Sequence, residues 1–478
     1  MSVANTHYGP EKIARILEKR NSIFFIGIGG IHMSSLAHLT CLRGYRTGGS
    51  DRTESALTRR LAGEGVEIFY GHDAAHLAGY DAVVYTVAIS PDNPEYRYAQ
   101  EHGLPCISRA DYLGYLMTGY PVRIGISGMH GKSTCTSMCA EVLTLGGADP
   151  TVLSGAELVS MGGAYRIGGG KIFLFEACEY MDSFLDFHPT IAVVLNIEED
   201  HMDYFRDLDQ ICASYRTFAG ITREAPEGGC VVMNGDDANV RRALSGFAGR
   251  KLVFGVENRS VDICATELAE ESGRYSFLLT VLGEEWGRVS LKVPGKHHIY
   301  NALATAAVAY LAGIPAADAI RGISAFAGAK RRMEYKGRLN GAPVYDDYGH
   351  HPTEVAATLA GARGMTACRL FCVFQPHTYS RTQALFREFA GAFGDADRVL
   401  MPDIYAARET DTLGVSSTLL CSAIGERAQA YPGKEGFAQI AGILRREVKE
   451  KDTVIVMGAG DVEKVLGYLP LSEEDVCQ

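Results

Sequence analysis

The segment from Gly128 to Thr134 reads Gly-Met-His-Gly-Lys-Ser-Thr and brings two glycines, a lysine and two hydroxyls together. An apolar run, Val122 to Ile126, precedes it, and a stretch of helical character, Cys135 to Leu145, follows. A glycine turn between a strand and a helix points backbone N–H groups and the positive end of the helix dipole at an anion. There Lys132 can reach terminal phosphates and Ser133 can ligate Mg²⁺, which predicts a polyphosphate site.

The turn departs from the general P-loop pattern at one position. That pattern has a glycine five residues before the glycine of Gly-Lys, and this sequence has Ile126 there. A glycine turn that caps a helix beside a solvated lysine is the alternative interpretation.

Two apolar runs that follow the turn end in polar residues. Lys171 to Glu176 is the first, and Ile191 to Asn196 leads into a segment that contains His201. Ligands of open α/β sheets bind beyond the carboxyl ends of the strands. Ser133, Glu176 and His201 are therefore the candidate Mg²⁺ ligands beside the phosphates. A solvated or turn-capping side chain is the alternative for each residue taken singly.

The beginning of the chain has the pattern of a Rossmann-like βαβ unit. A strand over Ser22 to Ile26 leads into the glycines of Gly27 to Gly30, a helix to Leu42 and an acidic residue, Asp51. The dinucleotide fingerprint is incomplete, because His32 stands where its third glycine would be. The unit therefore fits any ligand whose pyrophosphate rests on a helix N-terminus and is weak support for NAD.

The last part of the chain repeats an alternation of strands and helical stretches. Tyr345 to Tyr348 is followed by His350 and His351, and the next strand ends in Gln375 to Arg381. Two loops with histidine and arginine at consecutive strand ends suggest an anion or carboxylate pocket, with ordinary loop polarity as the alternative. Arg331-Arg332, which precedes these strands, is either a hinge that reaches a nucleotide on closure or a basic linker exposed to water.

Length and pattern together predict an α/β protein of three domains. At roughly 150 residues per domain, 478 residues suggest three. We expect an N-terminal Rossmann-like domain at 1–118, a central P-loop ATPase-type domain at 119–328 and a C-terminal Rossmann-like domain at 329–478.

Composition excludes several classes of protein. Hydrophobic content of 47% and charged content of 22% are ordinary for a globular chain. The net charge of −11 argues against a nucleic-acid partner. We find no apolar run long enough for a membrane span and no signal peptide, so we expect a cytoplasmic protein with reduced cysteines. Charge and periodicity do not fix the oligomeric state, which we expect to be a monomer or weak dimer.

The sequence resembles the Mur ligases, ATP-dependent enzymes of bacterial peptidoglycan synthesis. The motifs that carry the resemblance are Phe25 to Ser34, Gly128 to Thr134, Glu176 to Glu179, Asn196 to Asp203, Gly295 to Ala302, Arg331 to Glu334, Tyr345 to Pro352 and Gln375 to Arg381. They occur in family order over nearly the whole chain. The family's phosphate turn is Gly-x-x-Gly-Lys-[Ser/Thr]-[Ser/Thr], so Ile126 is no longer an anomaly.

The resemblance implies acyl activation with ATP and Mg²⁺. The first motif and the Asp-Asp-Tyr-Gly-His-His-Pro motif point to the branch that adds L-alanine to the lactyl carboxylate of UDP-N-acetylmuramate. The carboxylate would take the γ-phosphoryl group, and the amine of alanine would then displace phosphate from the acyl phosphate. The first domain would hold the UDP-sugar, the second ATP and the third the amino acid.

The resemblance also implies roles for single residues. Lys132, His130, Glu176 and His201 would be catalytic, and Ser133, Glu176 and His201 would serve Mg²⁺. The ATP site would comprise Gly128, Met129, His130, Gly131, Lys132, Ser133, Thr134, Asn301 at adenine, Arg332 at the phosphates and Asp347 at the ribose. The UDP-sugar site would comprise Gly29, Gly30, Ile31, Asp51 and Asn93, and the amino-acid pocket would comprise Tyr348, His350, His377 and Arg381.

Two features depart from sister ligases. No lysine occurs from Tyr204 to Ile221, where several relatives have a carbamoylated lysine, and Cys178 and Tyr180 replace more acidic residues. The first departure agrees with the alanine-adding branch. A ligase that recycles murein tripeptide onto the same sugar nucleotide is the nearest alternative. A folylpolyglutamate-type ligase, a non-catalytic ATP-binding protein and a Rossmann dehydrogenase are more distant ones.

Overall fold

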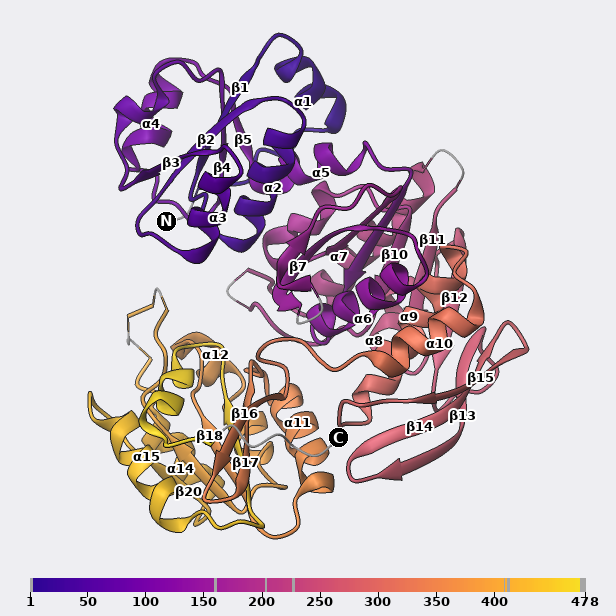
Figure 1. Cartoon of the computed structure of the whole chain (residues 1–478), viewed down its shortest axis with the longest axis vertical. Coiled ribbons are helices and arrows are strands. Elements are labelled where there is room, and N and C mark those ends of the chain that lie inside the picture. Colours follow the sequence, from indigo (N-terminus) through magenta and orange to yellow (C-terminus); the bar gives the residue numbers. More distant parts are fainter. Residues whose placement is uncertain are drawn as a thin grey trace.

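The computed structural model describes residues 3–158, 161–202, 204–225, 228–407, 409–410 and 413–472. Three α/β domains follow one another along the chain, each built on its own β-sheet (Figure 1). The α/β class and the three-domain architecture expected from the sequence are confirmed.

The first domain is a parallel five-stranded sheet in the order β3-β2-β1-β4-β5. Its strands are β1 Ser22–Ile26, β2 Arg46–Asp51, β3 Glu67–Tyr70, β4 Ala82–Tyr85 and β5 Cys106–Ser108. Its helices are α1 Pro10–Leu17, α2 Ile31–Leu42, α3 Ala56–Gly63, α4 Pro94–Glu101 and α5 Arg109–Met117. The strand order reverses beside β1, so the glycine turn after β1 lies at the switch point where such sheets bind ligands.

The middle domain contains a ten-stranded sheet in the order β15-β14-β13-β12-β11-β10-β6-β9-β7-β8. Its strands are β6 Val122–Ser127, β7 Thr151–Leu158, β8 Gly163–Arg166, β9 Ile172–Glu176, β10 Ile191–Val194, β11 Cys230–Asn234, β12 Arg250–Gly255, β13 Ile263–Glu271, β14 Arg274–Val281 and β15 Glu284–Ser290. Its helices are α6 Lys132–Leu145, α7 Leu208–Ile221, α8 Ala238–Leu244, α9 His297–Leu311 and α10 Ala316–Ala325. The central strands are parallel, and β6 runs between β10 and β9, which places the phosphate turn at the middle of the sheet edge.

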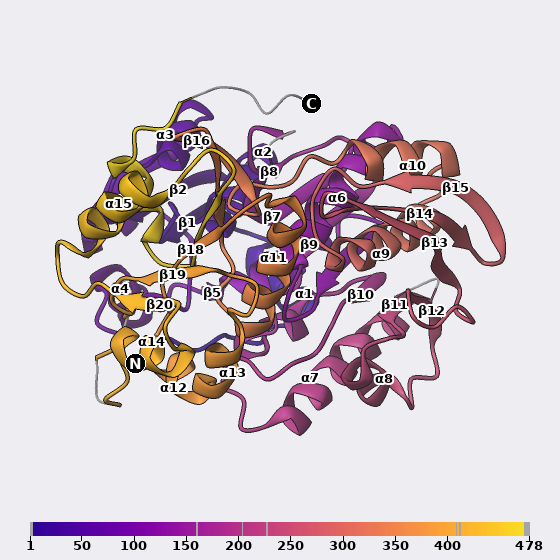
Figure 2. The ribbon, with the colours of Figure 1, turned by 90° about the horizontal axis from the view of Figure 1, so that it is seen from below.

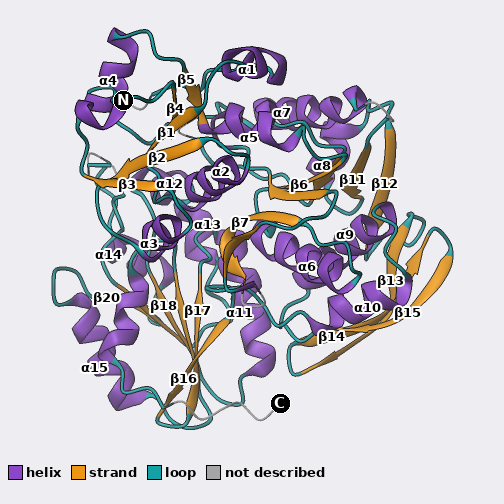
Figure 3. Cartoon of the chain, turned by 45° about the horizontal axis from the view of Figure 1, so that its top comes forward, coloured by secondary structure: helices purple, strands orange, loops and turns teal. Residues whose placement is uncertain are grey.

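The third domain has a six-stranded sheet in the order β16-β17-β21-β18-β19-β20, parallel except for the edge strand β16. Its strands are β16 Glu334–Leu339, β17 Ala342–Asp347, β18 Leu370–Phe374, β19 Arg398–Met401, β20 Ala428–Ala430 and β21 Thr453–Met457. Its helices are α11 Pro352–Met365, α12 Tyr379–Ala384, α13 Phe386–Gly391, α14 Ser417–Ile424 and α15 Gly436–Glu447. Helices flank the strands of each sheet in Figure 3.

The core of the middle domain explains why α9 is rich in alanine. Ala302, Ala306 and Ala309 are fully or almost fully buried in the same apolar cluster as Met138 and Val142 of α6. Small side chains let α9 pack closely against α6, the helix that follows the phosphate turn. This packing fixes the direction of α6 and hence the position of the turn.

The middle and third domains are in direct contact (Figure 2). The β13–β14 turn meets α11, since a Cβ on Gly273 would lie 2.5 Å from the backbone oxygen of Gly361. An ion pair also joins Lys330 to Glu157 across this interface. Side chains at the carboxyl ends of both sheets therefore line the same cavities.

The structure shifts one predicted helix. β14 and β15 pair antiparallel at one edge of the middle sheet. The helix after the phosphate turn begins at Lys132 rather than at Cys135, because Gly131 is its N-cap in the left-handed conformation. The antiparallel edges formed by β8 and β16 were not predicted. Among the described residues, no helix is long and apolar enough to cross a membrane, and none of the eleven described cysteines is in a disulfide.

Candidate active site

Two glycines shape the turn that connects β6 to α6. Gly128 has φ 141° and Gly131 has φ 81°, values that side chains disfavour. A Cβ on Gly128 would lie 2.9 Å from Cβ of Leu195, and one on Gly131 would lie 3.0 Å from Oδ1 of Asn301. The backbone of the turn therefore packs closely on both neighbours and leaves the N-terminus of α6 open to an anion.

Lys132 is held by a carboxylate that sequence reasoning did not assign to the site. Its Nζ donates to both carboxylate oxygens of Glu179, at 3.2 and 3.0 Å, and to the backbone oxygen of Met129. His201 Nε2 lies 3.4 Å from the same carboxylate. Burial would raise the pKa of Glu179, but the Lys132 and His201 charges outweigh it and lower that pKa. Glu179 therefore positions two of the predicted catalytic side chains.

Ser133 and Glu176 form the oxygen-rich part of the site. The Ser133 hydroxyl donates to Oε2 of Glu176 at 3.1 Å, while Oε1 accepts from the Ser154 hydroxyl and the Gly155 N–H. A hydroxyl and a carboxylate are hard oxygen donors, and this chemistry fits Mg²⁺. The structure thus brings two of the three expected metal ligands together, whereas His201 pairs with Glu179.

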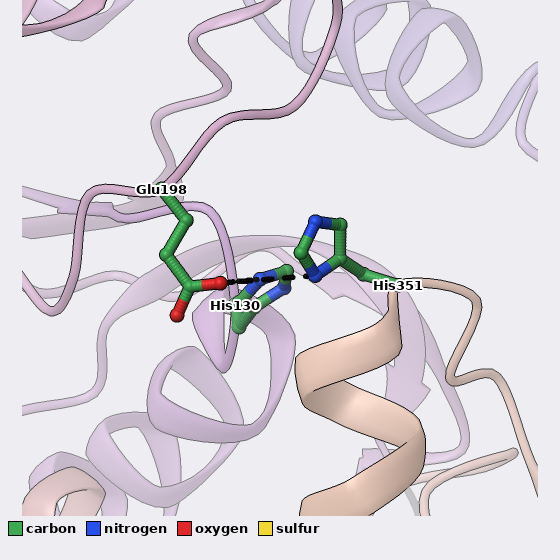
Figure 4. Close-up of side chains that lie close together, drawn as sticks. All are labelled: His130, Glu198 and His351. Atoms are coloured by element: carbon green, nitrogen blue, oxygen red, sulfur yellow. Dashed lines mark ion pairs between the residues drawn. The ribbon is translucent and has the colours of Figure 1, made fainter. Parts of the chain in front are cut away.

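His130 lies between two carboxylates from different domains. Its Nε2 is 3.4 Å from Oε2 of Glu198, and its Nδ1 is 3.3 Å from Oε1 of Glu354 on α11. The ring of His351 lies 4.5 Å from that of His130 (Figure 4). Burial alone would lower the pKa of His130, but Glu354 and Glu198 raise it to about 9. The imidazole is therefore a cation at the domain interface at neutral pH.

A cavity beside the turn collects most residues predicted to bind ATP. Its walls include His130, Gly131, Thr134, Asn301, Arg332 and Asp347. Asp347 accepts N–H groups of Gly349 and Met333 at 2.8 and 2.9 Å, which holds its carboxylate in place. Arg332 is thus part of a cavity wall between the middle and third domains rather than of an exposed linker. The roles of these residues toward a nucleotide stay predictions.

A second cavity lies between the strand-end loops of the middle and third domains. Its walls include Tyr180, Asp200, His201, His377, Ser380 and Arg381. Nε and one terminal nitrogen of Arg381 are each 3.0 Å from Oδ1 of Asp200, and its other terminal nitrogen is 3.3 Å from His377. Burial lowers the pKa of His377 to about 4, so this imidazole is neutral beside the guanidinium.

Tyr348 and His350 lie near this second cavity without being among its principal walls. The His350 ring is 6.1 Å from the His377 ring, and its Nδ1 is 3.5 Å from Glu354. The guanidinium groups of Arg331 and Arg332 lie 5.0 and 5.3 Å from the centre of the Tyr348 ring. Their proposed place in an amino-acid pocket stays a prediction.

The residues predicted at the UDP-sugar lie around the switch point of the first sheet. The Gly29 N–H donates to Oδ2 of Asp51 at 2.8 Å, and Ile31 begins α2 directly after Gly30. Asn93 is the N-cap of α4, where Oδ1 accepts two backbone N–H groups. The structure thus brings Gly29 and Asp51 together. That these two residues, Gly30, Ile31 and Asn93 contact a ligand stays a prediction.

Sequence reasoning missed Glu179, Glu198, Asp200 and Glu354 as site residues. Glu179, Glu198 and Asp200 lie in the Mur ligase motifs, close to Glu176 and His201, so the motifs could have indicated them. Their roles depend on pairing with distant side chains, which spacing along the chain does not reveal. Asp203, the last residue of one motif, lies outside the described residues.

Comparison with known proteins decides the family. Three family models match in order: "Mur ligase family, catalytic domain" at 22–121, "Mur ligase middle domain" at 126–309 and "Mur ligase, glutamate ligase domain" at 331–460. The chain belongs to the Mur ligase family.

Individual Mur ligases agree with this result. The UDP-N-acetylmuramate–L-alanine ligase of Caldanaerobacter subterraneus is 44% identical over 94% of this chain and 97% of its own, and that of Clostridium novyi is 42% identical over the same shares. The solved UDP-N-acetylmuramate–alanine ligase of Thermotoga maritima superposes with TM-score 0.77 at 25% identity, covering 94% of this chain and 98% of its own. A murein peptide ligase of Psychrobacter arcticus gives TM-score 0.69 at 26% identity, covering 93% and 97%.

Proposed function

We propose that this Mur ligase joins L-alanine to the lactyl carboxylate of UDP-N-acetylmuramate, with ATP converted to ADP and phosphate. One structural observation carries the proposal. Glu179 contacts Lys132 at the phosphate turn and His201 at the wall of the second cavity, so a single buried carboxylate connects the two places. A ligase needs this adjacency, because its activated acyl group must meet an amine.

The reaction begins with a carboxylate that must approach a triphosphate. Such an approach of like charges requires cationic groups preorganised at the site. Lys132 and the N-terminus of α6 supply positive charge at the turn, and Arg332 lines the cavity on the opposite domain. The carboxylate oxygen bonds to the γ-phosphorus, the bond to ADP breaks, and an acyl phosphate remains.

The second half of the reaction needs an amino acid held by its carboxylate. Arg381 presents a guanidinium fork, the geometry that binds carboxylates in a bidentate manner. The amine nitrogen then bonds to the acyl carbon, phosphate leaves with the electron pair of the broken C–O bond, and the amine loses a proton. The neutral His377 beside Arg381 adds no repulsive charge to the incoming amino acid.

Mg²⁺ belongs to the proposal as the ion that neutralises the phosphates. Ser133 and Glu176 would hold it, and its chemistry is to shield charge on the transferred phosphoryl group. His201 would support this site through Glu179. The MurF ligase of Thermotoga maritima has been solved in complex with ADP, which supports an adenine nucleotide as a ligand of this chain.

We assign residues 1–118 to the UDP-sugar, 119–328 to ATP and 329–478 to the amino acid. Gly29, Gly30, Ile31, Asp51 and Asn93 would face the UDP-sugar at the switch point of the first sheet. The cytoplasm is the compartment we propose for the reaction, because ATP and the nucleotide sugar are its substrates.

A tripeptide-recycling ligase is the competing function. The murein peptide ligase of Psychrobacter arcticus shares the fold, but relatives 40–44% identical to this chain carry the alanine-ligase name. Mass spectrometry of the product decides between them. Incubation with UDP-N-acetylmuramate, ATP, L-alanine and tripeptide should give the alanyl product, and the tripeptide adduct alone would contradict the proposal.

A further inference from the structure

His130, Glu198 and His351 form a compact group of metal-ligating atoms between two domains. One nitrogen of each histidine and one oxygen of Glu198 all lie within 4.8 Å of one another. Figure 4 shows the two rings and the carboxylate converging from the phosphate turn, the loop after β10 and the start of α11. We propose that these three side chains bind a borderline transition-metal cation of the Zn²⁺ class, at a site distinct from the Mg²⁺ ligands Ser133 and Glu176.

The partners of His351 fix which of its two nitrogens carries the proton. Its Nε2 lies 3.2 Å from the backbone oxygen of Glu199, to which only an N–H can donate. Nδ1 is therefore the unprotonated nitrogen of this ring, and it faces Oε2 of Glu198 at 3.7 Å. It also accepts the Thr353 N–H as the N-cap of α11, over a long 3.4 Å.

His130 also directs one nitrogen at Glu198 and the other at a second acceptor. Its Nδ1–H faces the Glu354 carboxylate at 3.3 Å, and its Nε2 faces the Glu198 carboxylate at 3.4 Å. Nε2 is buried and makes no hydrogen bond within the described part of the chain. Histidines that ligate metals almost always donate their other N–H to a carboxylate or a backbone carbonyl. Both histidines of the cluster already have this outer support.

The distances of the two histidine nitrogens from Glu198 suit tetrahedral coordination. Ligand bonds of about 2.1 Å to Zn²⁺ place neighbouring ligand atoms about 3.4 Å apart. His130 Nε2 and His351 Nδ1 lie 3.4 and 3.7 Å from the same oxygen of Glu198. Two imidazoles and one carboxylate favour Zn²⁺, Co²⁺ or Ni²⁺ over Mg²⁺, which prefers oxygen ligands. The cation replaces the proton that His130 otherwise carries between Glu198 and Glu354.

The cluster lies between two domains, so a cation bound there affects how the domains are held together. His130 and Glu198 belong to the middle domain and His351 to the third, so one bound ion fastens the two domains together. His130 and Glu198 also line the cavity of the predicted nucleotide site, so the fourth coordination position opens toward that cavity. Occupancy therefore stabilises the closed arrangement and slows nucleotide exchange.

Metal titration of the full chain tests the site. Zn²⁺ binding is followed by calorimetry in millimolar Mg²⁺, which occupies the oxygen-rich site, and Co²⁺ is followed by its visible absorption. The wild type should bind one equivalent of Zn²⁺ and give the intense absorption of four-coordinate Co²⁺. His351→Asn, which keeps an N-cap residue, and Glu198→Gln should each weaken Zn²⁺ binding by at least about tenfold.

A second His–Glu–His group provides the matched control. His72 and His76 each hydrogen-bond to a different oxygen of buried Glu95 in the first domain. His72→Asn is the same chemical change as His351→Asn and should leave Zn²⁺ affinity and the Co²⁺ spectrum unchanged. The proposal is overturned if the wild type binds no Zn²⁺ in the presence of Mg²⁺, if both cluster variants bind as tightly as the wild type, or if His72→Asn weakens binding equally.

Discussion

Lys132 Nζ lies 3.0 Å from Oε2 of Glu179, a carboxylate that is only 1% exposed. The other oxygen of that carboxylate is 3.4 Å from His201 Nε2. The lysine of the phosphate turn is thus positioned by a residue that itself reaches toward the second cavity. Glu179 is the side chain that joins the two halves of the proposed reaction.

Lys132→Ala should reduce ATP-dependent phosphate release at least about 10³-fold, because it removes the cation that faces the transferred phosphoryl group. The far-UV circular dichroism spectrum should not change, since His201 Nε2 still lies beside the Glu179 carboxylate. Lys171→Ala, at an exposed lysine before β9, is the control and should retain full activity. Normal turnover of Lys132→Ala would overturn the assignment of the site.

Ser133→Ala should raise the Mg²⁺ concentration for half-maximal activity by about tenfold, because it removes one of two hard oxygen ligands. Activity at saturating Mg²⁺ should largely recover. Ser137→Ala, one turn later in α6, is the control, because it removes a hydroxyl that donates only to the Ser133 backbone oxygen. An unchanged Mg²⁺ requirement in Ser133→Ala would exclude this residue as a ligand.

Raising the pH through 9 should remove the stability that His130 contributes. Its pKa is raised from 6.5 to about 9 in the folded chain, so the contribution is complete below pH 6.5 and is lost as pH rises through 9. The shift corresponds to roughly 3 kcal/mol. Denaturant midpoints of the wild type should therefore fall between pH 6.5 and 9 relative to those of His130→Gln.

The exposed His102 provides the control for this pH series. His102→Gln should keep the wild-type pH dependence. Parallel midpoints for wild type and His130→Gln across the whole range would show that Glu198 and Glu354 do not stabilise the charged imidazole.

Arg381→Lys should raise KM for L-alanine at least about tenfold, because lysine keeps the charge beside Asp200 but loses the bidentate fork. KM for ATP should stay within about twofold of the wild type, since Arg381 lines the second cavity and not the first. Arg387→Lys, the same change at an exposed arginine of α13, is the matched control. A change in KM for ATP alone would place Arg381 at the nucleotide instead.

The strands and the phosphate turn could be predicted because their signals are local. The apolar run of β6, the glycines and the helix that follows are consecutive in the chain, and the predicted β1 agrees with the structure at both ends. The carboxyl ends of parallel strands meet at one edge, so the sequence alone could place Ser133 and Glu176 together.

The pairing partners of the site residues could not be predicted, because folding brings each partner from a distant part of the chain. Glu179 is 47 residues from Lys132, and His351 is 152 residues from the Glu199 carbonyl that it contacts. The second of these contacts depends on how the third domain docks, which no local pattern encodes. Such contacts decide which nitrogen of a histidine is free and which carboxylate holds a lysine.

The central claim concerns which amine accepts the acyl group, and phosphate release with a panel of acceptors tests it most directly. The purified chain is incubated with ATP, Mg²⁺ and UDP-N-acetylmuramate, and L-alanine, other amino acids or murein tripeptide is added singly. We predict release that requires both the sugar nucleotide and L-alanine. Release with the tripeptide but not with L-alanine would contradict the account.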